Sequence, residues 1–133
     1  MAGWRGQGRR RSDRGSSSAT QMALIIPLIF AFVLLAIQAS MWFYARNVAL
    51  AAAEAGARVS AGRTSTLGEG LAAAEQFAAQ AGGNTLNEVS VTGSRSAETT
   101  TITVVAQAQR LLPAVPIDLA VTQTASLPVE RLS

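Results

Sequence analysis

The apolar run MALIIPLIFAFVLLAIQASMWFY, from Met22 to Tyr44, decides the fold of this chain. None of its 23 residues is charged. A helix of ~20 mostly apolar residues is long enough to cross a bilayer. Pro27 lies near the start of the run, where a helix loses few backbone hydrogen bonds, so we expect a slight kink and no break. The run predicts one transmembrane helix over residues 22–44.

Two polar residues, Gln38 and Ser40, interrupt the second half of the run. The side chain of Gln38 can hydrogen-bond to a partner helix, or it can lie near the lipid headgroups. The sequence leaves both interpretations open. Trp42 and Tyr44 end the run at the level where an aromatic belt marks a membrane interface.

The segment before the run, residues 1–21, is a basic head rich in Gly, Ser and Arg. It holds five arginines against a single acid, Asp13, in a chain whose net charge is +3. Such a composition cannot bury a core, which predicts a disordered head. Positive charge on one side of a span marks the cytoplasmic side. We therefore predict a single-pass protein of the inner (plasma) membrane, with its N-terminus in the cytoplasm and its C-terminal domain outside.

Two targeting signals are alternatives to a permanent anchor. A cleaved signal peptide has an apolar region of about 7–15 residues, which is shorter than this run. A twin-arginine signal would continue with apolar residues, but Arg9–Arg10–Arg11 is followed by Ser12, Asp13 and Arg14. Both are less consistent with the sequence than a transmembrane helix.

Strong helix formers follow the run, so we expect residues 45–63 to extend the same helix outward. Small apolar residues recur there at helical spacing, and Gly56 would let another backbone approach closely. This stripe can pack on its own domain or on a neighbouring subunit, and the sequence does not separate the two. Its members, with Gln38, are the candidate helix–helix interaction residues: Val48, Ala52, Ala55, Gly56 and Val59.

The remaining residues, 64–133, predict a small extracytoplasmic α+β domain. A second helix is expected from about Leu67 to Ala81, ended by Gly82–Gly83–Asn84. The hydrophobic period then changes to two, which predicts a three-stranded antiparallel sheet with one apolar face. The three runs are residues 89–92, 101–108 and 117–122, with a turn at 93–96. The loop 110–116 could be a contact surface, although we expect it to pack under the sheet.

Candidate catalytic chemistry is nearly missing from the sequence. The chain has no His and no Cys, which excludes thiol nucleophiles, disulfides, the usual zinc sites and His-based acid–base catalysis. The acids after the run are spread singly along the chain. We therefore expect no enzyme activity, no cofactor and no metal. The basic head alone does not predict nucleic-acid binding.

Several short segments, in this order, resemble the TadE-like (TadE/TadG) pilus-assembly proteins of the tight-adherence, Flp-type pilus system. The resemblance spans roughly residues 14–60. It comprises Arg14–Gly15–Ser16, then QMALIIPL at residues 21–28, the span, Tyr44–Ala45–Arg46, and AAEAGAR at residues 52–58.

This resemblance implies a structural, pilin-like role, as a pseudopilin or minor pilin that assists pilus biogenesis or a related secretion system. The implied partners are the membrane, other TadE-, TadF- or TadG-like pilins and inner-membrane platform proteins, in a homo- or hetero-oligomer. Some family members are trimmed by a prepilin peptidase, which makes Gly15, Ser16 and Gln21 the candidate processing region. The family's usual Glu corresponds to Gln21, which can hydrogen-bond but cannot neutralise a neighbouring subunit's amine. We therefore expect the basic head to be retained.

A different class of function remains as the alternative. A membrane-tethered sensor or ligand-binding domain would have the same anchor and an outer α+β domain. A specific ligand pocket would favour it, whereas a complex with pilus-assembly proteins would favour the structural role.

Overall fold

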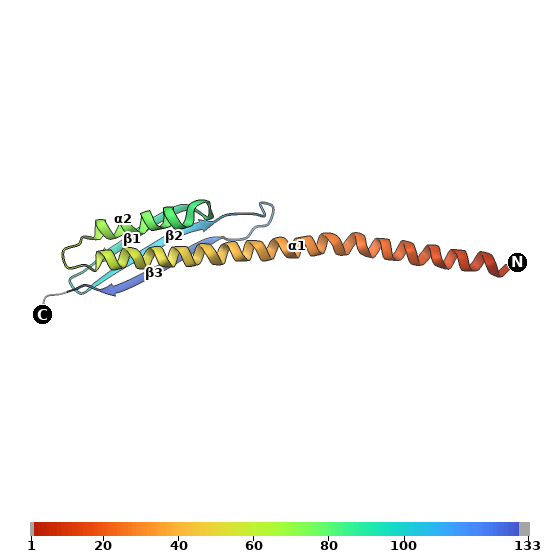
Figure 1. Cartoon of the computed structure of the whole chain (residues 1–133), viewed down its shortest axis with the longest axis horizontal. Coiled ribbons are helices and arrows are strands. Elements are labelled where there is room, and N and C mark those ends of the chain that lie inside the picture. The colour runs from red at the N-terminus through yellow and green to blue at the C-terminus, as the bar shows by residue number, and fades with distance from the viewer. Residues whose placement is uncertain (1, 131–133) are drawn as a thin grey trace. The chain divides into compact units, whose positions relative to one another are not determined.

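The computed structural model describes residues 2–130, with side chains described from Ser18 onward. It confirms the predicted α+β class: a long N-terminal apolar helix, a second helix and a three-stranded antiparallel sheet (Figure 1). The elements in chain order are α1 (Ala2–Ser60), α2 (Leu67–Phe77), a π-helical turn η1 (Ala78–Gly82), a 3-10 turn η2 (Gly83–Thr85), β1 (Leu86–Arg95), β2 (Thr99–Ala108) and β3 (Ala120–Pro128).

The chain forms two compact units, Met1–Ile37 and Gln38–Ser133. Their boundary lies inside the predicted span 22–44 rather than at its end. The first unit is helical from Ala2 and continues through Pro27 without a break. Composition predicts disorder for residues 1–21, so the helical backbone of this segment differs from that expectation. Adding a residue to an existing helix requires no new nucleus, which favours such an extension.

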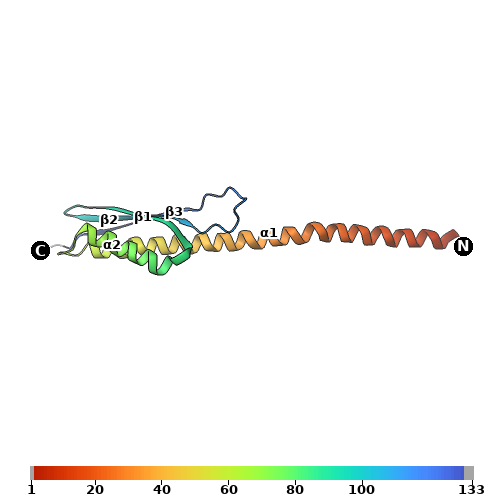
Figure 2. The ribbon, with the colours of Figure 1, turned by 90° about the horizontal axis from the view of Figure 1, so that it is seen from above.

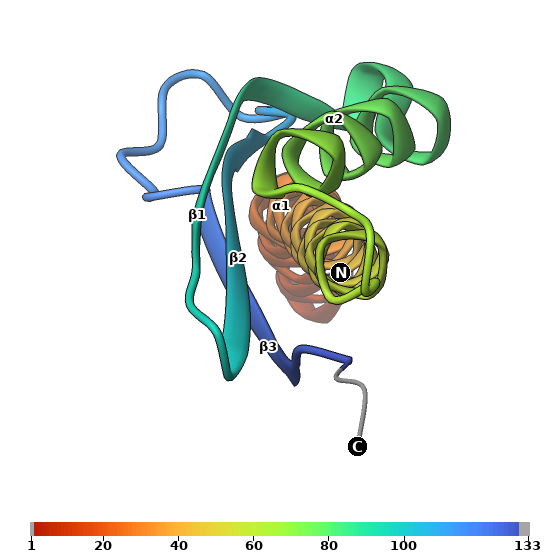
Figure 3. The same ribbon diagram turned by 90° about the vertical axis from the view of Figure 1, so that its left-hand side faces the viewer.

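In the second unit, α1 and α2 lie against one face of the sheet, as Figure 3 shows. The strand order is β1-β2-β3, and both neighbouring pairs are antiparallel. The core between the layers consists mostly of small side chains from α1 together with branched ones from the sheet, of which Ile102, Val104 and Val121 are the largest fully buried apolar ones. A three-stranded sheet is only marginally stable by itself, so the helices supply the layer that its apolar face needs.

A capping box begins α2. The Thr66 side chain accepts a hydrogen bond from the backbone N–H of Glu69 (3.2 Å), and the Glu69 carboxylate accepts one from the backbone N–H of Thr66 (3.3 Å). The sequence Thr-x-x-Glu is the signature of this motif. The apolar face of this helical segment lies on the core: Ala74 and Ala78 are buried, and three further side chains pack against the core, namely Leu71, Phe77 and Ala81.

A β-bulge changes the register of β1. The pairing with β2 shifts between Asn87 and Ser90, and Glu88 lies in the left-handed region at φ 53°. The extra residue turns Leu86 into the core and leaves Val89 exposed, although the alternating pattern predicts that Val89 faces inward. That prediction is therefore wrong, because period-two alternation fails across a bulge.

Two predicted boundaries in the sheet are also corrected. Gly93 lies within β1, opposite Ile102, and the turn comes later, at Ser96–Glu98. The third strand is Ala120–Pro128 rather than 117–122. The alternation in the predicted run is nevertheless confirmed for two of its inward-facing residues, because Leu119 and Val121 are buried.

Polar contacts join the end of α1 to the strands. The hydroxyls of Ser60 and Thr100, both fully buried, lie 2.6 Å apart and hydrogen-bond to each other. The Arg95 guanidinium donates to the carbonyl oxygen of Gly62 (3.2 Å). The backbone N–H of Glu130 donates to the carbonyl of Ala61 (2.9 Å). These contacts fix the C-terminal end of α1 against the sheet.

Candidate functional site

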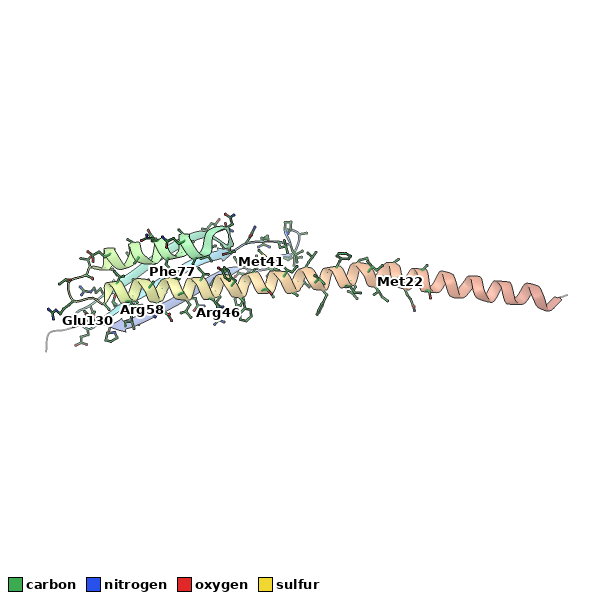
Figure 4. All side chains as sticks on the ribbon, in the orientation of Figure 1. Met22, Met41, Arg46, Arg58, Phe77 and Glu130 are labelled. Atoms are coloured by element: carbon green, nitrogen blue, oxygen red, sulfur yellow. The ribbon has the colours of Figure 1, made fainter. Side chains whose placement is uncertain are left out.

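The apolar run is exposed over its first part. Every side chain from Ser18 to Ile37 is exposed, including large ones such as Phe30 and Phe32. Figure 4 shows side chains projecting from α1 around Met22. By length and composition, α1 is able to cross a membrane. An apolar helix exposed all round needs a nonpolar environment, so the structure is compatible with a single-pass anchor.

Gln38 is the first residue of the second unit, and its side chain is only 3% exposed. Its Nε2 donates to the backbone carbonyl of Gln109 at 2.9 Å, and its Oε1 accepts from the backbone N–H of Leu111 at 2.6 Å. The amide thus pairs with the backbone of the β2–β3 loop through both of its ends. The structure gives Gln38 a partner within its own chain, which neither interpretation of the sequence included.

The loop that Gln38 contacts is closed by Arg110. Its guanidinium donates to the carbonyl oxygens of Val115 and Ile117, each at 2.8 Å. The expectation that the loop packs under the sheet is wrong for most of it, since residues 113–116 are exposed. Figure 2 shows the loop leaving the sheet between β2 and β3. Side-chain and backbone hydrogen bonds hold it, rather than burial.

The predicted small-residue stripe divides between a buried and an exposed part. Val48, Ala52 and Gly56 are buried within their own chain, Ala55 is half-buried, and Val59 is 38% exposed. The buried face of α1 is rotated around the helix axis relative to the predicted stripe. It also includes residues that are not members of that stripe: Ala45, Ala49, Ala53, Ala57 and Ser60. Alanine on several sides of the helix gives little hydrophobic contrast, so periodicity alone could not centre the face.

Two glycines bring α1 and α2 close together. A Cβ on Gly56 would lie 2.7 Å from the carbonyl oxygen of Gly70 and 2.8 Å from the Cβ of Ala74. A Cβ on Gly70 would lie 2.5 Å from the Cβ of Ser60. All three distances are shorter than van der Waals contact, so each helix requires glycine at this crossing. The small-residue pattern of α1 predicts a close contact at Gly56, but no pattern in the sequence pointed to Gly70, which lies on the apolar side of α2.

Aromatic residues surround the start of the second unit. The Tyr44 hydroxyl donates to the carbonyl oxygen of Ala81 at 3.1 Å. The Trp42 ring makes an edge contact with Phe43, with centroids 5.5 Å apart, and lies 5.9 Å from the Arg46 guanidinium carbon. Such aromatic and cationic side chains are typical of a membrane interface.

The candidate processing residues lie in α1. Gln21 is exposed, whereas the side chains of Gly15 and Ser16 lie outside the described residues. Among the described residues, no group of three or more acidic side chains could hold a metal ion. The exposed side chains of Glu54 and Arg58, four residues apart on α1, form an ion pair at 3.8 Å.

Comparison with known proteins identifies one family. Residues 16–58 match the family of TadE-like proteins, a stretch that contains the exposed apolar run and most of the buried face of α1. No curated protein and no solved structure matches the chain. TadE-like proteins form a non-enzymatic pilus-assembly family, so the match supports a part in Tad pilus assembly and an association with its machinery. Residues 16–58 of the chain are therefore similar to TadE-like proteins, which confirms the resemblance predicted from the sequence.

Proposed function

We propose that this chain is a structural, pilin-like accessory protein, a pseudopilin or minor pilin, of the tight-adherence pilus. The observation that carries the proposal is the double use of α1. One part of the helix is an exposed apolar run, and another part is the buried spine of a folded α+β unit. One chain thus combines an apolar segment that can serve as an anchor with a folded domain that is available to partners.

The proposed orientation follows from charge. The arginine-rich head lies on the N-terminal side of the apolar run, and the second unit has nearly balanced charge. The positive-inside rule then places the head in the cytoplasm and the α+β unit outside the inner membrane. In this orientation the folded unit is available to the other pilins, and the exposed run is available to platform proteins in the membrane.

The head is proposed to remain on the mature protein. Gln21 stands where the family's processed members have Glu, and a neutral amide cannot balance the charge of a new amino terminus. Sequencing of the mature N-terminus should therefore recover the arginine-rich head. A mature chain that begins at Ser16 would instead show that a prepilin peptidase removes it.

The role in assembly is tested by deleting the gene and restoring it with a tagged copy. We expect the deletion to reduce surface pili, the tagged copy to restore them, and pilus-assembly proteins to be recovered with it after crosslinking. As a control, the tagged copy is also tested with Thr124→Ala, a change on the exposed outer face of the sheet. This copy should restore pili as well as the unchanged one does. Unchanged piliation in the deletion strain, with no pilus component on the tagged protein, would contradict the proposal.

A further inference from the structure

The part of the apolar run that belongs to the first unit is short for a membrane span. From Met22 to the unit boundary at Ile37 it contains 16 residues. At ~1.5 Å per residue these cover ~24 Å, whereas the hydrocarbon core of a bilayer is ~30 Å thick. The residues before Met22 are polar, namely Ser18, Thr20 and Gln21 among others. About four more residues are needed, and these are the first residues of the folded unit, beginning at Gln38.

The β2–β3 loop lies against α1 at the position of Gln38. Gln38 binds the backbone of Gln109 and Leu111 directly. The loop continues as LLPAVP over residues 111–116, six apolar residues without a charge. Leu111 is 40% exposed and Val115 is 36% exposed. An apolar loop that is both exposed and fixed in place is costly in water.

Part of the backbone of this loop is already paired within the folded unit, and in a nonpolar environment unpaired polar groups are costly. The N–H of Leu111 is bonded to Gln38, and the N–H of Val115 donates to the carbonyl of Leu112. Pro113 and Pro116 have no N–H to satisfy. Arg110 binds the carbonyl oxygens of Val115 and Ile117.

We propose that the loop of residues 111–116 inserts into the interfacial region of the lipid bilayer, beside the helix that anchors the protein. The partner is the lipid surface of the leaflet that α1 leaves as it enters the folded unit. Arg110 lies at the base of the loop, where its cationic group can reach lipid phosphates while its stem covers apolar surface. The aromatic side chains of Phe43 and Tyr44, half exposed on the same turns of α1, belong to this interface.

This inference rests on the membrane anchor in the proposed function, so the test measures the two separately. Because the chain has no Cys, single-cysteine variants can be labelled cleanly with a fluorophore. Three exposed alanines provide matched sites: Ala114 in the loop, Ala31 in the apolar run and Ala97 in the β1–β2 turn. Each full-length variant is reconstituted in phosphatidylcholine–phosphatidylglycerol vesicles that contain lipid-attached quenchers, both near the headgroups and within the acyl chains.

We expect the probes at Ala31→Cys and Ala114→Cys to be quenched several-fold more strongly than the probe at Ala97→Cys. Quenching at Ala31 with only background quenching at Ala114, equal to that at Ala97, would overturn the loop insertion and leave the anchor standing. Background quenching at Ala31 would overturn the anchor and the insertion together.

Discussion

Gly68 and Gly70 lie two positions apart on α2, but their surroundings are opposite. A Cβ on Gly68 would meet only the Thr66 hydroxyl oxygen, at 3.8 Å, which is ordinary contact. A Cβ on Gly70 would lie 2.5 Å from the Cβ of Ser60 and 2.7 Å from the carbonyl oxygen of Gly56. Neither neighbour is the end of a flexible side chain, so α1 and α2 would have to separate.

We therefore predict that Gly70→Ala lowers the free energy of unfolding by about 1–3 kcal/mol, the usual cost of overpacking. Gly68→Ala is the control, and it should raise that free energy by up to about 1 kcal/mol because alanine favours the helix. Urea unfolding of the detergent-solubilised protein measures both. Equal effects of the two substitutions would show that the helices do not meet closely at Gly70.

Gln38 gives a second prediction at this scale. Gln38→Leu removes both hydrogen bonds to the loop and leaves the N–H of Leu111 and the carbonyl of Gln109 unpaired. An unpaired buried polar group costs about 1–3 kcal/mol. The loop should open, and trypsin should cut faster after Arg110. The exposed Gln76→Leu serves as the control, and cleavage in both variants at the wild-type rate would contradict the bracing role of Gln38.

At the scale of single elements, the bulge in β1 is the feature that most changes side-chain placement. Glu88 holds φ 53°, a conformation that costs a residue with a Cβ about 1–2 kcal/mol relative to glycine. Glu88→Gly should therefore stabilise the fold by up to about 1 kcal/mol, whereas Asn87→Gly, at a neighbouring position without positive φ, should destabilise it. Thermal unfolding of the two variants checks the difference. Destabilisation by Glu88→Gly would argue against the bulge.

The elements themselves could be predicted wherever hydrophobic contrast was strong. The apolar run, the buried face of α2 around Ala74 and the inward side chains of β2 all follow from periodicity. The buried face of α1 could not be centred, because alanine surrounds much of that helix. The bulge depends on the backbone angle of one residue, Glu88, which no pattern of side chains reveals. The contact between Gln38 and the loop joins residues 71 positions apart in sequence.

For the whole molecule, the important property is where along α1 the predicted membrane span ends and where the folded unit begins. The sequence predicts that the span ends at Tyr44, whereas the folded unit already begins at Gln38. The proposed anchor therefore predicts that the first residues of the folded unit belong to the bilayer interface. The side of the membrane on which that unit lies is therefore decisive, because the proposed pilin-like role requires it to lie outside the cytoplasm.

Cysteine accessibility tests this claim most directly. Ala97→Cys and Ser12→Cys, one in the β1–β2 turn and one in the head, are treated separately with a membrane-impermeant maleimide on cells whose cytoplasmic membrane is intact. We expect Ala97→Cys to be labelled at once and Ser12→Cys to be labelled only after lysis. Labelling of Ala97→Cys only after lysis, in a stable full-length protein, would place the folded unit in the cytoplasm and contradict the account.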